Sequence, residues 1–144
     1  MRPGRFEEET SAMIHIADSG FLIALLDRLD SFHGWAKSVA EEEAPPYLVC
    51  EAVCAEVAAV TGTPAPLLQM LERGDLKLGF SLSDEFTAVR KLTLKYRDQP
   101  MDLADACVVR MSEIYRVCRV FTVDRADFTV YRRWGTKTIP CVFP

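Results

Sequence analysis

The chain has 144 residues, of which 49% are hydrophobic and 26% are charged, and its formal net charge is −4. These proportions predict one globular domain and exclude a disordered chain, while the acidic balance disfavours binding of nucleic acid through bulk positive charge. The longest unbroken apolar run, 21–26, is much shorter than the roughly 20 residues that cross a bilayer, so we expect no membrane span.

The beginning of the chain is predicted to be a flexible leader over 1–12, followed by a single domain over 13–144. Glu7, Glu8 and Glu9 stand where a secretory signal would place its apolar stretch, so we expect a cytoplasmic protein. Five cysteines without a disulfide or zinc spacing fit the reduced thiols of that compartment.

Apolar periodicity and turn residues predict strands that alternate with helices along the chain. The expected strands are 13–17, 47–49, 76–80, 119–123 and 138–143. The expected helices are 21–28, 31–43, 50–60, 66–73, 83–96, 102–115 and 126–133, with Asp30 or Ser31 as the cap of the second and Ser83 as the cap of the fifth. This alternation predicts a three-layer α/β/α domain with a mainly parallel sheet of about five strands.

Acidic side chains follow two of the predicted strands. Asp18 comes directly after the first strand and Asp124 after the fourth, so both should project from the carboxyl edge of the sheet, where open α/β folds bind ligands. Asp105 lies in the first turn of its predicted helix, on the polar side beside Ser112 and opposite an apolar stripe. That stripe comprises Leu103, Cys107, Met111 and Ile114.

Helical phase decides between Glu51 and Glu56 as a fourth acid. One apolar stripe of their helix comprises Cys50, Val53, Cys54, Val57 and Val60. Glu56 lies about 40° beyond Val60 and so borders the buried face, whereas Glu51 lies on the far shoulder of the stripe. We therefore prefer Glu56.

Carboxylates that meet at one edge repel one another, and a hard cation removes that repulsion. Mg²⁺ or Mn²⁺ takes oxygen ligands, whereas Zn²⁺ would want imidazole and thiolate ligands, and neither His15 nor His33 completes a zinc spacing with the cysteines. The alternative is that the acids are helix caps: Asp18, Asp102 and Asp124 or Asp127 all precede predicted helices, and Glu56 would then be solvated.

Taken together, four acidic segments resemble the ordered motifs of the PIN-domain ribonucleases. They are Ile14–Leu22 (IHIADSGFL), Val53–Val57 (VCAEV), Met101–Ala106 (MDLADA) and Thr122–Phe128 (TVDRADF), and the resemblance extends from 13 to about 142. It implies a five-stranded parallel sheet, a divalent metal and hydrolysis of RNA phosphodiester bonds. Carried over by position, the catalytic and metal-binding acids are Asp18, Glu56, Asp105 and Asp124, with Asp102 and Asp127 as supporting or capping acids.

The same resemblance implies partners: an RNA substrate, an antitoxin if the chain is the toxin of a toxin–antitoxin pair, and a second copy of the chain in a homodimer. Apolar residues around Trp35 are candidates for part of the dimer surface. From the residues themselves, Arg125 beside Asp124 is the candidate for gripping RNA phosphate, while Ser19 and Thr122 are candidates for orienting a carboxylate or a water.

Two other functions stay open at this point. One is an aspartate-dependent phosphatase with Asp18 as nucleophile, although Gly20 stands where that chemistry usually wants a second acid. The other is a non-catalytic interaction module. Two basic clusters, around Tyr96 and Tyr131, are either phosphate-gripping and base-stacking surfaces or solvated helix faces. They comprise Arg90, Lys91, Lys95 and Arg97, and Arg125, Arg132 and Arg133.

Overall fold

The main sheet is parallel, as predicted, and it lies at the centre of the molecule. A computed structural model of the chain describes residues 12–144, so nearly all of the predicted leader lies outside the described residues. Within that range the sheet has five strands in the order β3-β2-β1-β4-β7. Their bounds are β1 Ile14–Ala17, β2 Tyr47–Val49, β3 Leu76–Leu78, β4 Cys118–Phe121 and β7 Cys141–Val142.

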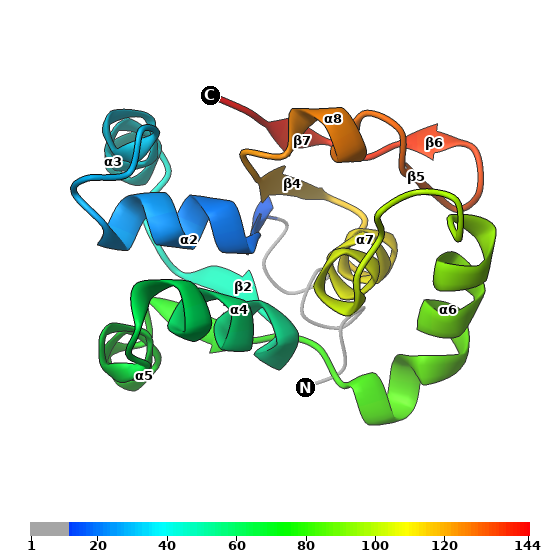
Figure 1. Ribbon diagram of the computed structural model, residues 1–144, viewed down its shortest axis with the longest axis horizontal. Coiled ribbons are helices and arrows are strands. Elements are labelled where there is room, and N and C mark those ends of the chain that lie inside the picture. Colours follow the sequence, from blue (N-terminus) through cyan, green and yellow to red (C-terminus); the bar gives the residue numbers. More distant parts are fainter. Residues whose placement is uncertain (1–11) are drawn as a thin grey trace.

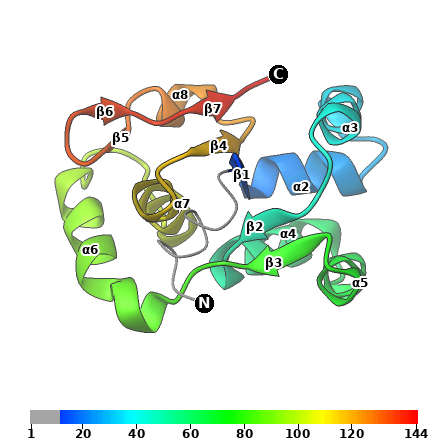
Figure 2. The ribbon, with the colours of Figure 1, turned by 180° about the vertical axis from the view of Figure 1, so that it is seen from behind.

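Helices cover both faces of this sheet, which confirms the predicted three-layer architecture. Their bounds are α2 Ser19–Leu26, α3 His33–Glu42, α4 Glu51–Thr61, α5 Ala65–Arg73, α6 Leu82–Lys95, α7 Leu103–Ile114 and α8 Arg125–Phe128. α2, α3 and α5 lie on one side of the strands, and α6 and α7 lie on the other (Figures 1 and 2). β1 pairs in parallel with both β2 and β4, so the first strand occupies the middle of the sheet.

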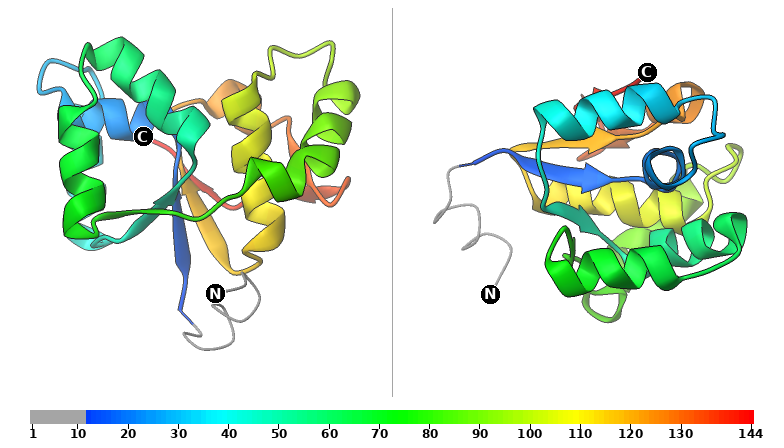
Figure 3. Two further views of the ribbon diagram at one scale, coloured as in Figure 1. Left: turned by 90° about the horizontal axis from the view of Figure 1, so that it is seen from below. Right: turned by 90° about the vertical axis from the view of Figure 1, so that its left-hand side faces the viewer.

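The strand order brings distant parts of the sequence to one edge. β1 runs directly into the start of α2, with β4 beside it (Figure 3). Ala17 pairs with Phe121, and the backbone N–H of Asp18 donates to the Phe121 carbonyl at 3.0 Å. The residues that follow β1 and β4 therefore leave the sheet side by side.

α7 is buried on almost every side, so the predicted division into one apolar and one polar side is wrong, although Cys107 and Met111 of the predicted stripe are buried as expected. Ser112, assigned to a polar face, is fully buried, whereas Leu103, assigned to the core, is 50% exposed. The reason is that α7 contacts α6, α4 and the strands β1 and β4 at once. Small side chains such as Ala104 and Ala106 allow this close packing on several sides.

Other helix boundaries also differ from the prediction. Ser81, rather than Ser83, caps α6 and accepts a hydrogen bond from the Asp84 N–H at 3.3 Å. α3 begins after Phe32, and the carboxylate of Asp30 accepts from the Phe32 N–H instead of capping the helix. In α4, Val60 is 67% exposed, so the buried stripe ends one turn earlier than predicted.

The C-terminal region departs most from the prediction, because the expected helix over 126–133 ends at Phe128. β5 (Arg132–Arg133) and β6 (Lys137–Thr138) then form a short antiparallel hairpin. Trp134 and Gly135, both with positive φ, make its turn. The predicted strand over 138–143 is divided between β6 and β7. No helix among residues 12–144 is long and apolar enough to cross a membrane.

Candidate active site

An acidic pocket of about 380 Å³ lies at the carboxyl edge of the sheet. Carboxylates from four separate segments line it: Asp18, Glu56, Asp102, Asp105, Asp124 and Asp127. Within the part of the chain that the structure describes, no lysine, arginine or histidine lines this pocket. The acids that the sequence picks out therefore line one pocket, and no basic side chain among residues 12–144 lines it with them.

Asp18 stands at the N-cap position of α2, but its side chain does not cap the helix. One carboxylate oxygen, Oδ2, accepts a hydrogen bond from the Thr122 hydroxyl at 2.7 Å. The other, Oδ1, is buried and has no hydrogen-bond partner among the described residues. Burial raises the pKa of Asp18 to about 6. An unpaired buried carboxylate oxygen is costly unless a ligand satisfies it. Because the side chain makes no capping hydrogen bond, the helix-cap interpretation of this residue is wrong.

Thr122 connects two of the predicted acids. It follows β4 and is fully buried. Its hydroxyl donates to Asp18 and accepts a hydrogen bond from the Asp124 backbone N–H at 3.1 Å. Ser19, the other hydroxyl that the sequence singles out, lines the pocket. One buried hydroxyl thus fixes the Asp18 carboxylate relative to the backbone that carries Asp124.

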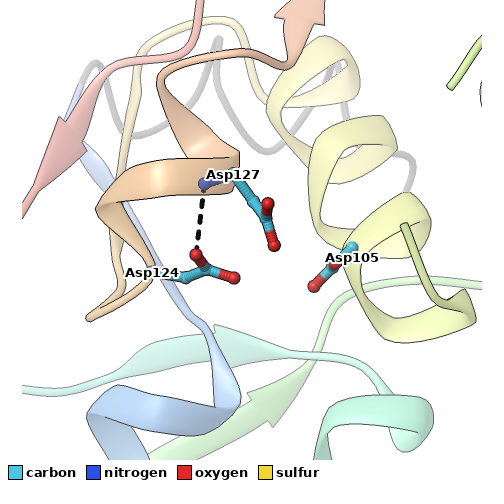
Figure 4. A group of neighbouring side chains, drawn as sticks. All are labelled: Asp105, Asp124 and Asp127. Carbon is cyan, nitrogen blue, oxygen red and sulfur yellow. Dashed lines mark hydrogen bonds between the residues drawn. The ribbon is translucent and has the colours of Figure 1, made fainter. Parts of the chain in front are cut away.

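Three aspartates form a close group: Asp105, Asp124 and Asp127. Each offers a carboxylate oxygen, and these oxygens all lie within 4.8 Å of one another. Figure 4 shows the three side chains pointing into the same space, with the Asp127 N–H donating to Asp124 Oδ1 at 3.2 Å. Asp127 is predicted to have only a supporting or capping role, but its carboxylate belongs to this close group. Asp127 lies three residues after the N-cap residue Asp124, and a capping side chain accepts from the N–H at that position. This spacing predicts that Asp124 and Asp127 lie close together.

Asp105 is held at the first turn of α7. The Asp102 carboxylate caps this helix, accepting from the Asp105 N–H at 2.8 Å, in the capping position that the sequence predicts. The Tyr131 hydroxyl donates to Asp105 Oδ2 at 3.0 Å. Burial, together with the charges of Asp102 and Asp18, raises the pKa of Asp105 to about 7. The sequence singles out Tyr131 only as the aromatic residue of a basic cluster, and its contact with Asp105 is not predicted, because its hydroxyl reaches the site from a segment predicted to be helical.

Helix α4 presents Glu56 to the pocket and Glu51 to solvent. Glu56 is half-buried, and burial together with the neighbouring Asp102 and Asp18 raises its pKa. Glu51 is exposed. Helical phase therefore selects the glutamate that lines the pocket, although the stripe used to choose it extends one turn too far.

Neither basic cluster forms a base-stacking surface at the pocket. Tyr96 and Tyr131 are both buried. Arg132 donates to the carbonyls of Thr129, Val130 and Tyr131, where it closes off the end of α8. Arg125 is exposed; it donates to the Pro144 carbonyl at 3.2 Å, and its guanidinium lies 4.6 Å from the centre of the Phe143 ring.

The donor set of the pocket fits a hard divalent cation. All the candidate ligands are carboxylate oxygens, and one of them is buried without a partner among the described residues. Burial, reinforced by the charges of neighbouring carboxylates, raises the pKa of several of them. Mg²⁺ and Mn²⁺ prefer oxygen ligands and bridge to phosphate oxygens. The arrangement is therefore suited to hydrolysis of a phosphate ester.

Comparison with known proteins gives one informative similarity. No protein-family model matches the sequence. The chain is similar to the protein named Ribonuclease VapC26 from Mycobacterium tuberculosis, with 29% identity over 126 residues. The aligned stretch spans 83% of this chain and 93% of that relative.

Proposed function

We infer that the chain belongs to the PIN-domain ribonucleases and that it hydrolyses RNA phosphodiester bonds at the acidic pocket with the help of a divalent cation. The observation that carries this proposal is the state of Asp18, a buried carboxylate with one oxygen left free beside the other acids. The similarity to a protein named as a ribonuclease supports the choice of RNA as substrate.

The residues proposed to hold the cation, Mg²⁺ or Mn²⁺, are Asp18, Glu56, Asp105 and Asp124, and the position of Asp127 supports adding it to this set. Such a cation supplies activation of water and neutralisation of charge on phosphate oxygens. The acids hold it at the carboxyl edge of the sheet, where a phosphate group has access from solvent.

Residues next to the proposed cation-binding acids are proposed to orient them. Thr122 fixes one oxygen of Asp18 and leaves Oδ1 free. Asp102 holds the first turn of α7 and with it the backbone of Asp105. Arg125, exposed and next to Asp124, is proposed to contact an RNA phosphate beyond the pocket. Positive charge at that place would offset the acidic lining as the substrate approaches.

The phosphatase alternative has less support from the site. A second acid two residues after Asp18 would replace Gly20, where even a Cβ atom would overlap the side chain of Val123. The segment after β4 therefore leaves no room for that residue.

Partners follow from the proposed family. We propose that the chain is the toxin of a toxin–antitoxin pair and forms a homodimer. Trp35, the centre of the predicted dimer surface, packs edge-on against Phe21 with ring centroids 5.7 Å apart, so only its remaining surface is available to a partner. Light scattering at micromolar concentration should give twice the 16.2 kDa of one chain, and a mass of one chain would remove the homodimer.

Cleavage of a labelled single-stranded RNA tests the enzymatic proposal. The wild-type protein should cleave it with Mn²⁺ and not with excess EDTA. Loss of an outer-shell partner of a metal site typically costs 10–100-fold, and loss of a ligand should cost more, so Glu56→Gln should be at least about 100-fold slower. Glu51→Gln, at an exposed position of the same helix, should keep wild-type activity. Cleavage of a small phosphomonoester but not of RNA would support the phosphatase, and the absence of both activities would support the non-catalytic module.

A further inference from the structure

Tyr131 has a buried hydroxyl group that touches the acidic pocket. The side chain is fully buried, and its hydroxyl donates to Asp105 Oδ2 at 3.0 Å. A tyrosine hydroxyl ordinarily carries its proton at neutral pH, so the phenol is the donor and the carboxylate is the acceptor in this bond.

The ring of Tyr131 is fixed by its neighbours. It packs edge-on against Phe128 and against Tyr96, with centroid separations of 5.3 Å and 5.2 Å. Its backbone N–H donates to the carbonyl of Asp127 at 3.0 Å. Tyr131 is thus bonded through its side chain to one member of the close aspartate group and through its backbone to another.

We propose that Tyr131 is a positioning residue that orients the Asp105 carboxylate for cation binding. With Oδ2 accepting a hydrogen bond from the phenol, the rotation of the carboxylate is restricted, so its oxygens keep one orientation toward the neighbouring acids. The bond also ties α7, which carries Asp105, to the segment after α8. This inference rests on the proposed function, since it assigns Tyr131 a role toward the same cation.

Tyr96 supplies a matched control. It is also a buried tyrosine, it lies against the Tyr131 ring, and its hydroxyl accepts a hydrogen bond from the Arg132 N–H at 2.8 Å. Within the described residues, that hydroxyl makes no hydrogen bond to a carboxylate of the pocket. Tyr131→Phe and Tyr96→Phe each keep the ring and remove one buried hydroxyl, so they differ chiefly in whether Asp105 loses its donor.

The test is calorimetric titration of the purified proteins with Mn²⁺ alone, with urea unfolding in EDTA as a measure of stability. Loss of an outer hydrogen bond to a metal ligand typically weakens metal binding 10–100-fold. We expect Tyr131→Phe to raise the Kd for Mn²⁺ by about tenfold, toward the lower end of that range. Tyr96→Phe should leave the Kd unchanged even if it lowers the stability of the fold. Saturating Mn²⁺ should restore much of the RNA cleavage that Tyr131→Phe loses.

The outcomes separate this inference from the proposed function. An unchanged Kd in Tyr131→Phe, or equal weakening in both variants, would overturn the positioning role while leaving a metal-dependent nuclease intact. If the wild-type protein itself bound no Mn²⁺, the proposed function would fail first, and the role of Tyr131 with it.

Discussion

Asp18 should make the metal-free protein less stable as the pH rises. Its pKa is about 6 in the folded protein and 3.8 when unperturbed, mainly because burial disfavours the charged form. A group with a raised folded pKa stabilises the fold at low pH, and this contribution is lost as the pH rises from about 4 through 6. The difference between the two pKa values corresponds to about 3 kcal/mol of unfolding free energy above pH 7.

Asp18→Asn removes this pH-dependent contribution to the unfolding free energy, because the amide is neutral at every pH and its oxygen still accepts a hydrogen bond from Thr122. In EDTA the variant should therefore be more stable than wild type at pH 8, by up to about 3 kcal/mol, and show no such gain at pH 4. Urea unfolding at the two pH values measures this difference. A stability difference that does not change between pH 4 and pH 8 would contradict the burial argument.

At the level of single residues, most of the site is predictable from the sequence, for a physical reason. Asp18 and Asp124 follow strands, and parallel strands end at one edge, so their proximity is set by topology alone. Glu56 is selected by helical phase. The hydrogen bond from Tyr131 to Asp105 is different, because it joins side chains 26 residues apart across a segment whose secondary structure is predicted wrongly.

The start of α2 lies directly against the segment after β4. A Cβ atom on Gly20 would overlap Val123, which stands between Thr122 and Asp124. Gly20→Ala should therefore destabilise the fold by about 1–3 kcal/mol, as overpacked sites do. It should also slow RNA cleavage, because Val123 must move and the adjacent Thr122 and Asp124 must then move as well.

Gly34→Ala is the matched control for this change. Gly34 lies in α3, and a Cβ atom there meets nothing within 4 Å. Alanine in a helix is favoured over glycine by about 0.5–1 kcal/mol, so this variant should be as stable as wild type or more so and fully active. Equal stability of the two variants in thermal unfolding would show that the Gly20 contact is not constraining.

Element types are predictable here where the local pattern is strong, and boundaries are not. The strands β1, β2 and β4 are short apolar runs next to turn residues, and all three form close to where they are predicted. α8 and the β5–β6 hairpin are not predictable in the same way. Their structure depends on Arg132 satisfying three backbone carbonyls and on a turn with positive φ at Trp134, an unusual conformation for a bulky residue.

Packing of the whole molecule explains the remaining errors. A helix that touches one neighbour shows one apolar stripe, and the prediction for α7 assumes this case. α7 instead lies between α6 and the sheet, so Ser112 is buried, and its hydroxyl is satisfied by the Val109 carbonyl at 2.6 Å. Such burial on several sides depends on tertiary contacts, which helical periodicity does not specify.

At the scale of the whole molecule, the fold brings six carboxylates together, and a bound cation should stabilise it. On the proposed function, Mn²⁺ should bind the folded site and should have little affinity for the dispersed acids of the unfolded chain. At about 100 times its Kd it should add about 2.7 kcal/mol to the unfolding free energy. Thermal unfolding with millimolar Mn²⁺ and with EDTA measures this effect, and Asp18→Asn should shift less than wild type. Superimposable wild-type curves would count against the metal site.

Substitutions at Asp105 and Asp102 test most directly whether the pocket cleaves RNA through its carboxylates. The two residues lie within one helical turn, so each variant serves as the control for the other. The measurement is the initial rate of single-stranded RNA cleavage in Mn²⁺ by Asp105→Asn and by Asp102→Asn. We expect Asp105→Asn to be folded and essentially inactive, because it loses a charged ligand oxygen. Asp102→Asn should be partly active and lose about 0.5–2 kcal/mol of stability if the amide caps α7 poorly. Wild-type cleavage by Asp105→Asn would contradict the account.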